Sequence, residues 1–404
     1  MSRPAGARVA GGPLRTVYFT LLVLWVVLLP LAVHGNLAQD ALPFFVAGEL
    51  SASDPGAVYS TSGDLFDPTP AFARRSCELA PVGTDCAQLT VTFVSPPPAL
   101  LVGRAAGVLG ADVAATLFRV LGAACLAGGM AVLWTRVAPR APEAPAYLVA
   151  TALLLTPFVM VPLALGQNSP VLFLSAAVGV RWAVRWPQLL ATAAIVVLAV
   201  VFKLFPIALL GILVWQRRWQ LLAWTVGLLV AVGALTAALV DGRLWRDFWD
   251  ASAALAPAAP ENPYNGSISA LLDLLGLPMR GAAGLVVLAV TGAAALAVLV
   301  WLRRRVDDDT MWAGAWVLLL VVVPMVWWHY LWVAVAAVAY AWVAGGARPR
   351  RLWCLPALAA LTFPISIPNG RGFAVPWAQA LFLVAVVALV AWLVGPVRRQ
   401  AITT

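Results

Sequence analysis

A few polar side chains beside long apolar runs are the residues of this 404-residue sequence that could do chemistry. Asp40 follows the first apolar run, at residues 17–33. A carboxylate at a membrane boundary that faces a cleft can act as a general base. The same aspartate could instead cap a helix, because it opens the helix-like stretch 41–50. Its position alone leaves both roles open.

Lys203 is the only lysine of the chain, and no other charge lies between Arg185 and Arg217. This run is long for one membrane span and short for two. We therefore predict that the chain turns at residues 203–206 and returns, as a shallow hairpin with the lysine at its tip. A lysine at membrane depth that faces a cavity suits a phosphate. Alternatively, its long side chain only reaches the membrane interface.

Two adjacent amides, Gln167 and Asn168, lie in the segment L-A-L-G-Q-N-S-P between two apolar runs. Such amides are costly in lipid unless they are paired or face a cavity. They could bind the hydroxyls of a sugar, because each amide offers donors and acceptors. Equally, they could satisfy backbone groups at a turn between two spans.

Further polar side chains lie near the ends of later apolar runs. His329 occurs in P-M-V-W-W-H-Y-L-W, where an interfacial aromatic belt explains the tryptophans and the tyrosine but not the histidine. A lone histidine can also be structural. Asn265 and Ser267 occur in N-P-Y-N-G-S-I-S, which also matches a glycosylation acceptor. Arg371, in P-N-G-R-G, is another cation on the same predicted face.

Membrane helices are the elements that must position these residues. The chain is 63% apolar and 11% charged, whereas a soluble domain has roughly 25% charged residues. We predict an all-α polytopic membrane protein with a single domain over residues 1–404, whose first span remains as an anchor. Spans are expected at residues 17–33, 112–134, 146–165, 170–184, 188–202, 204–216, 219–240, 282–302, 311–328, 330–346, 352–367 and 376–395. After prolines at 96–98, residues 97–109 are expected to form a half-embedded helix that stops at Gly107 or Gly110.

The charge distribution predicts the orientation of the chain. With the N-terminus in the cytoplasm, 17 of the 26 basic residues fall in cytoplasmic stretches, as the positive-inside rule requires. The net charge of +9 then needs no acidic partner such as nucleic acid. Both termini are cytoplasmic in this arrangement, and residues 34–96 and 241–281 form long extracytoplasmic loops. The candidate residues all map to the extracytoplasmic side, where they suit a phosphorylated, lipid-borne substrate.

Neither the cysteines nor the acidic residues form a recognisable metal motif. Cys77 and Cys86 lie in the first outer loop without a nearby histidine, so zinc is not expected and a disulfide is one alternative. Cys125 and Cys354 lie in apolar runs. The D-D-D run at 307–309 is expected to be a solvated cytoplasmic loop, and we find no glycine-rich phosphate loop. We expect neither a metal nor a cofactor.

The order of these motifs resembles the polytopic bacterial glycosyltransferases of family 87, in the GT-C fold class, which includes polyprenyl-phosphate-mannose-dependent mannosyltransferases. The resemblance rests on the outer Asp40, Tyr59, an aromatic–Pro-Pro–Ala-Leu-Leu stretch, G-Q-N at 166–168, K-x-x-P at 203–206, R-R-W at 217–219, N-x-S at 265–267 and W-x-H at 327–329. The chain departs from the family at S-P-P-P, where Tyr-Pro-Pro is usual, and in the insert at 60–92.

The resemblance implies a GT-C-type bundle of about 12 transmembrane helices with a long first extracytoplasmic loop. Asp40 would be the catalytic base that deprotonates an acceptor hydroxyl as it attacks the anomeric carbon, with inversion and departure of a polyprenyl phosphate. Lys203 and Arg371 would stabilise the departing phosphate, and His329 would lie beside the donor phosphate or the acceptor. The side chains that would contact the sugar or the acceptor are Gln167, Asn168, Tyr59, Asn265 and Ser267.

The implied partners are a polyprenyl-phosphate sugar donor, a cell-envelope glycolipid or glycan acceptor, and membrane lipids, at the bacterial inner membrane. Mannose is the expected sugar, and nothing in the sequence separates it from arabinofuranose. A transporter or lipid flippase would usually show charges inside several spans and an internal repeat, whereas here the charges are expected at the rims. A structural subunit of an envelope-synthesis complex is a third alternative.

Overall fold

The computed structural model describes residues 40–80, 91–137, 163–179, 185–262, 265–277, 281–303 and 306–344, with residues 16–17, 19–20, 22–24, 28, 183 and 279. In these residues every regular element is a helix, as predicted for an all-α protein. The one extended pairing among them is an isolated antiparallel bridge between Asn265 and Trp327.

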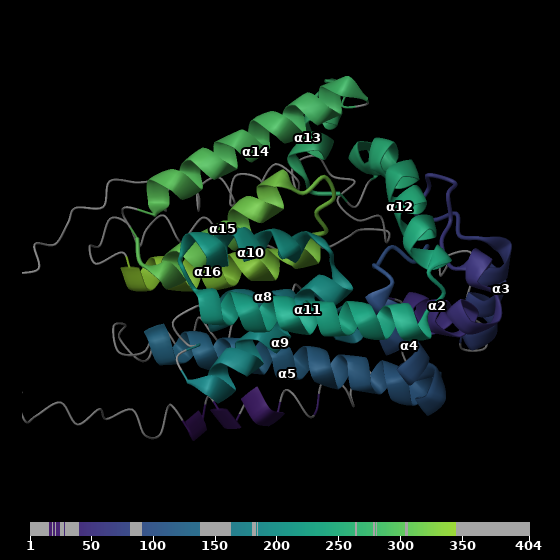
Figure 1. Ribbon diagram of the computed structural model, residues 1–404, viewed down its shortest axis with the longest axis horizontal. Coiled ribbons are helices and arrows are strands. Elements are labelled where there is room, and N and C mark those ends of the chain that lie inside the picture. Colours follow the sequence, from purple (N-terminus) through teal and green to yellow (C-terminus); the bar gives the residue numbers. More distant parts are fainter. Residues whose placement is uncertain are drawn as a thin grey trace, which may run out of the picture.

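The helices form two groups (Figure 1). The bundle helices are α5 (Ala111–Val137), α8 (Ser169–Val178), α9 (Trp186–Phe202), η4 (Phe205–Ala208), α10 (Leu209–Trp215), α11 (Trp219–Leu239), α14 (Ala282–Leu302), α15 (Asp308–Val322), η6 (Trp328–Leu331) and α16 (Trp332–Ala344). The loop helices are α2 (Leu42–Ser53), η1 (Pro55–Ala57), α3 (Pro70–Leu79), α4 (Pro98–Leu109), α12 (Arg243–Leu255), η5 (Ala256–Glu261) and α13 (Ile268–Leu274).

Three helical stretches in the described residues are long and apolar enough to cross a membrane: Ala111–Thr135, Trp219–Leu239 and Ala282–Leu302. They agree with predicted spans at 112–134, 219–240 and 282–302. The expected spans between 170 and 216 and between 311 and 346 correspond to shorter helices. The spans expected at 352–367 and 376–395 and most of those at 17–33 and 146–165 lie outside the described residues, so the complete bundle remains a prediction.

The chain reverses at Lys203, as predicted. The indole rings of Trp186, at the start of α9, and Trp224, near the start of α11, have centroids 6.1 Å apart. Because both helices begin at the same end of the bundle, the residues between them must turn and come back. Helix α9 stops at Phe202, Lys203 is extended, and η4 and α10 form the return.

This alternation separates two ends of the bundle. At the end that we call the site end, α2, α3, α4 and α12 gather (Figure 1), and the guanidinium of Arg104 in α4 donates to the Leu239 carbonyl at the close of α11. The opposite end carries Arg218, which pairs with Asp308 at 2.6 Å.

Helices α2 and α4 are in backbone contact. A Cβ on Gly48 or on Gly103 would overlap backbone atoms of the other helix. Helix α4 starts with Pro98, whose missing N–H is harmless at a helix N-terminus. It stops at Leu109, before Gly110, whose φ of 82° favours glycine. The helix expected at 97–109 is present as Pro98–Leu109, and of the two expected stops, Gly107 and Gly110, the structure has the second.

The acidic run at 307–309 is not the solvated loop that we expected. The Asp307 side chain accepts from the Thr310 backbone N–H at 2.8 Å and so caps α15. Asp308 pairs with Arg218, and Asp309 is buried with 4% of its surface exposed. The prediction failed because carboxylates at a helix N-terminus are stabilised by its free N–H groups.

Candidate active site

Asp40 is held at the site end by the turn that contains the two adjacent amides. The Asp40 backbone N–H donates to the Leu165 carbonyl at 3.0 Å. The Gln167 side-chain amide donates to the Asp40 carboxylate. Ala41, not Asp40, occupies the N-cap position of α2, and no side chain caps that helix. Of the two roles considered for Asp40, the structure therefore does not support the helix cap.

Helix α5 packs against this turn and donates a hydrogen bond to it. The Arg119 guanidinium, with 2% of the residue exposed, donates through Nε to the Ala164 carbonyl at 3.1 Å. A Cβ added to Gly122 would lie 3.0 Å from Leu163 Cδ2, so the glycine permits the close approach of α5. Gly166 has a φ of 71°, which suits glycine in a tight turn. Sequence reasoning passed over Arg119, although a single arginine inside the expected span 112–134 was a signal.

Lys203 lies close enough to Asp40 for the two charges to interact. Its Nζ is 5.6 Å from the centroid of the Tyr330 ring. Asp40 and Lys203 both lie outside the three helices that could cross a membrane. Burial raises the pKa of Asp40 to about 6, although the Gln167 hydrogen bond and the Lys203 charge act in the opposite direction. Burial lowers the pKa of Lys203 to about 8, against the influence of Asp40.

His329 joins the same cluster through η6. It has 4% of its surface exposed, stacks on Trp327 with ring centroids 6.0 Å apart, and meets the edge of Tyr330 at 5.1 Å. Burial, together with the Lys203 charge, holds the pKa of His329 well below its ordinary value. The imidazole is therefore neutral near pH 7, and it can give or accept a hydrogen bond but does not serve as a cation.

Asn265 is a structural clamp between two chain segments. Its Nδ2 donates to the carbonyls of Ala259 at 2.7 Å and Pro324 at 2.9 Å. Its Oδ1 accepts from the backbone N–H groups of Ser267 at 3.0 Å and Val326 at 2.9 Å. The amide is thus engaged with backbone on both sides, and the expected sugar contact of Asn265 stays a prediction.

Tyr59 and Ser267 also have structural partners. The Tyr59 hydroxyl donates to the Ser95 carbonyl at 2.9 Å, and its ring packs between Phe93 and Phe248. Ser267 caps α13 by accepting from the Ala270 backbone N–H. These contacts join the segments around residues 59, 95 and 267, and the expected substrate contacts of the two side chains stay predictions.

Asn168 and Arg371 are the two remaining candidates, and only Asn168 lies in the described residues. Asn168 is buried at 7% exposure, and its Oδ1 has no hydrogen-bond partner in the described part of the chain. Its neighbour Gln167 donates to Asp40 through its side-chain nitrogen. Arg371 lies outside the described residues, as does Cys86, and both expectations stay untested.

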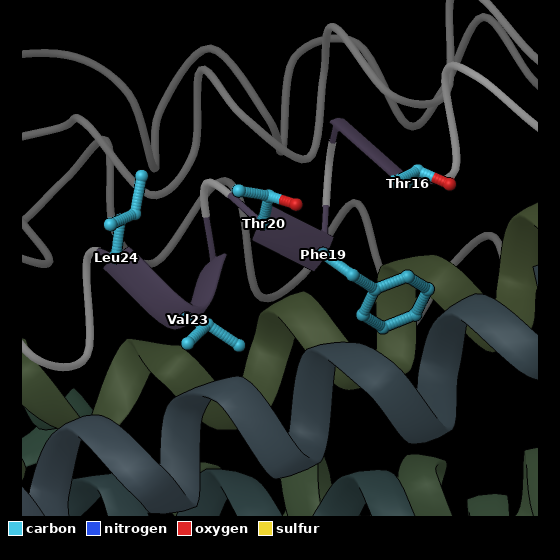
Figure 2. Close-up of a pocket in the computed structure, with 5 residues that line it drawn as sticks. All are labelled: Thr16, Phe19, Thr20, Val23 and Leu24. Atoms are coloured by element: carbon cyan, nitrogen blue, oxygen red, sulfur yellow. The ribbon is translucent and has the colours of Figure 1, made fainter.

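The described residues contain no group of three or more His, Cys, Asp or Glu side chains placed to hold a metal ion. A groove of about 490 Å³ runs along the beginning of the chain, where Phe19 extends toward neighbouring helices (Figure 2). Its described lining is Thr16, Phe19, Thr20, Val23 and Leu24. None of these described side chains is ionisable near neutral pH.

Apolar helices with a carboxylate, a lysine and a neutral histidine together at one end define a membrane protein with an ionisable site. The model of glycosyltransferase family 87 matches residues 93–326, which is more than half of the chain. The chain belongs to this family and is a membrane glycosyltransferase. The matched region contains Gln167 and Lys203, whereas Asp40 precedes it and His329 follows it. No curated protein matches the chain.

Proposed function

We propose that this glycosyltransferase transfers mannose, with inversion, from a polyprenyl-phosphate donor to a cell-envelope glycolipid or glycan. The observation that carries the proposal is the contact of Gln167 with the Asp40 carboxylate beside Lys203. The Asp40 carboxylate can accept a proton, and the Lys203 ammonium carries the positive charge that a leaving phosphate needs. We further propose that the site end faces the outside of the bacterial inner membrane.

Asp40 is the base in this mechanism. With a pKa of about 6, the carboxylate is mostly ionised at pH 7 and still basic enough to take a proton. The acceptor oxygen forms its bond to the anomeric carbon from the face opposite the phosphate, and its proton passes to Asp40. Gln167 holds the carboxylate in place through its amide. Positioned base catalysis of this kind contributes about 10²–10⁴-fold.

Lys203 serves the leaving group. As the bond between the anomeric carbon and the phosphate oxygen breaks, that oxygen keeps the electron pair and becomes more negative. A buried ammonium group stabilises this charge more strongly than an exposed one, because the surrounding dielectric is lower. Neutral His329 donates or accepts a hydrogen bond beside the same phosphate without adding charge. The Tyr330 ring, 5.6 Å from Nζ, helps to orient the lysine.

The first experiment replaces the base. We expect Asp40→Asn to lower transfer from polyprenyl-phosphate mannose to a membrane glycolipid extract by about 10²–10⁴-fold, with little change in the binding of the donor. The protein is purified in lipid nanodiscs, and transfer is followed with a radiolabelled sugar. Asp250→Asn is the matched control, since Asp250 is an exposed aspartate on α12 at the same end. Full activity of Asp40→Asn would remove Asp40 from the mechanism.

The same preparation separates the rival donor. Polyprenyl-phosphate arabinofuranose has the same lipid and phosphate, so it tests the sugar alone. Preferential turnover of the arabinose donor would keep the mechanism and change the substrate. Absence of transfer from both donors in the native protein, with the donors bound, would favour a structural role.

A further inference from the structure

The site end contains a cavity that none of the steps above uses. It has a volume of about 400 Å³ and lies between the first outer loop, η5 and the segment that leads to His329. Its described lining residues are Gly63, Asp64, Leu65, Phe66, Leu255, Ala258, Ala259, Asn262 and Met325. Three chain segments that are far apart in sequence thus meet around one space.

Buried hydrogen bonds fix the walls of this cavity. The Leu65 carbonyl accepts from both the backbone N–H and the hydroxyl of Thr92, at 2.8 and 2.9 Å. The Ala259 carbonyl accepts from the Asn265 amide, which also binds the backbone on both sides of Met325. A preformed cavity of this kind binds a ligand without first ordering its own loops.

Gly63 brings two of the walls together. Its φ of 81° is one that residues with a side chain rarely adopt. A Cβ at this position would lie 3.1 Å from the Ala254 carbonyl oxygen, so only glycine fits here without displacing the end of α12. Residues 63–66, which precede the stretch matched by the family model, therefore contribute a built part of the cavity.

The chemistry of the lining suits an uncharged sugar. Phe66 keeps 42% of its surface exposed, and Met325 and Leu255 add apolar contacts for the C–H faces of a sugar ring. The Asp64 carboxylate and the Asn262 amide can meet hydroxyl groups. No cation is present among the described lining residues, so a phosphate has no partner here and the donor headgroup is a poor fit.

The cavity is linked to the candidate active site through a short stretch of backbone. Asn265 forms a bridge with Trp327, and the Trp327 ring stacks on His329. Met325, on the cavity wall, is four residues from His329. A glycan held in the cavity therefore lies beside the segment that carries His329.

We propose that this cavity binds the saccharide part of the acceptor, and that Asn265 is a positioning residue that shapes it. The proposal rests on the function proposed above, because it names the place of that reaction's second substrate. It assigns the donor phosphate to the Lys203 side and the acceptor sugar to the outer loops.

The test fills the cavity with a larger side chain. Ala258→Trp places an indole in the cavity, whereas Ala256→Trp, in the same short helix, alters an exposed position outside the lining. Two measurements use the full chain in nanodiscs: transfer from polyprenyl-phosphate mannose, and the rise in unfolding temperature on addition of a glycolipid extract from the membranes of the producing cells. Sugar-free bacterial phospholipids serve as the blank for the second measurement.

We expect Ala258→Trp to raise the apparent acceptor KM by about tenfold or more, a change of about 1.4 kcal/mol, while the donor KM stays unchanged. The extract should raise the unfolding temperature of the native protein and of Ala256→Trp but not that of Ala258→Trp. Phe66→Ala should weaken acceptor binding in the same direction, and Trp249→Ala, which removes an exposed aromatic elsewhere at this end, should not.

The two proposals fail in different ways. If the extract stabilises the native protein and Ala258→Trp abolishes that effect, but neither sugar donor is turned over, the proposed reaction is wrong and the binding cavity stands. If Ala258→Trp and Ala256→Trp behave alike in both measurements, or the extract has no effect beyond the phospholipid blank, the cavity is not the acceptor site.

Discussion

At the scale of single residues, burial and neighbouring side chains set the charges of Asp40, Lys203 and His329. Asp40 is made more basic by burial and less basic by Gln167 and Lys203, and the balance leaves its pKa near 6. Lys203 loses part of its basicity by burial and lies against Tyr330. His329 stays neutral in the same surroundings. The pair Asp40 and Lys203 is therefore charged together only over a limited pH range.

This range predicts a bell-shaped pH dependence. In the proposed mechanism, activity requires an ionised Asp40 and a protonated Lys203, so kcat/KM should rise with pH through about 6 and fall above about 8. Arginine does not lose its proton in this range, so in Lys203→Arg the fall near pH 8 should disappear while a reduced activity remains. The measurement is kcat/KM against pH for both proteins. A fall that stays near pH 8 in Lys203→Arg would assign it to another group.

Gln167 gives a second expectation for the same profile. Its amide hydrogen bond stabilises the ionised form of Asp40, so its removal raises the pKa of that carboxylate. In Gln167→Leu the rising part of the profile should move to higher pH, and the falling part should not. The control is Gln220→Leu, which changes an exposed glutamine at the opposite end of the bundle. Gln167→Glu is unsuitable as a control, because it adds a second carboxylate. An unmoved rising part would contradict the role of Gln167.

At the scale of elements, the candidate site depends on the turn at residues 163–168, which packs against helix α5. Arg119 of α5 binds the Ala164 carbonyl, and the next carbonyl along, that of Leu165, binds the backbone of Asp40. The Arg119 side chain thus acts on the base through two residues of the turn. An arginine inside a helix that could cross a membrane is expensive to bury, which is consistent with a specific function in this place.

We expect Arg119→Met to lower kcat by about 10²-fold, because a displacement of about 1 Å at a reacting group has a cost of this size. The apparent donor KM should change much less, since Lys203 keeps its place. Arg119→Lys should recover part of kcat through one remaining hydrogen bond. Steady-state kinetics and unfolding temperature are measured together. Loss of stability in both variants with normal kcat in the folded fraction would show that Arg119 only supports the fold.

At the scale of the whole molecule, α9 and α11 both start at the end opposite the candidate site, and the chain between them turns at the site end. The indole contact of Trp186 with Trp224 and the ion pair of Arg218 with Asp308 place those residues at the end opposite the site. This arrangement agrees with the charge distribution along the sequence. By the positive-inside rule, we predict that the site end faces away from the cytoplasm.

The sidedness is open to direct labelling. In a background in which the four cysteines are replaced by serine, Asp67→Cys places an exposed thiol at the site end, and Arg217→Cys places one at the arginine end. In intact inner-membrane spheroplasts, a membrane-impermeant maleimide should label Asp67→Cys and not Arg217→Cys. After the membrane is opened with detergent, both should react. The reverse pattern in closed spheroplasts would place the site in the cytoplasm.

Several features of the fold could be predicted from local patterns. The helical class, the hairpin at Lys203, the helix from Pro98 and its stop at Gly110 all depend on neighbouring residues. The convergence of Asp40, Gln167, Lys203 and His329 on one end followed from the same alternation of spans. The acidic cap of α15 and the buried Arg119 were missed, because a charged residue's partner is chosen by distant parts of the chain.

The sequence by itself determined that this is a helical membrane protein, how its charges divide between two ends, and which family it resembles. These properties are sums over residues, so they do not require the positions of neighbours. Only the tertiary structure decided which hydrogen-bond partners the polar side chains have. Gln167 binds the base, whereas Asn265 and Tyr59 bind backbone and hold the outer loops. The same amide or hydroxyl serves either purpose, and the choice depends on which unsatisfied groups the fold brings within hydrogen-bond distance.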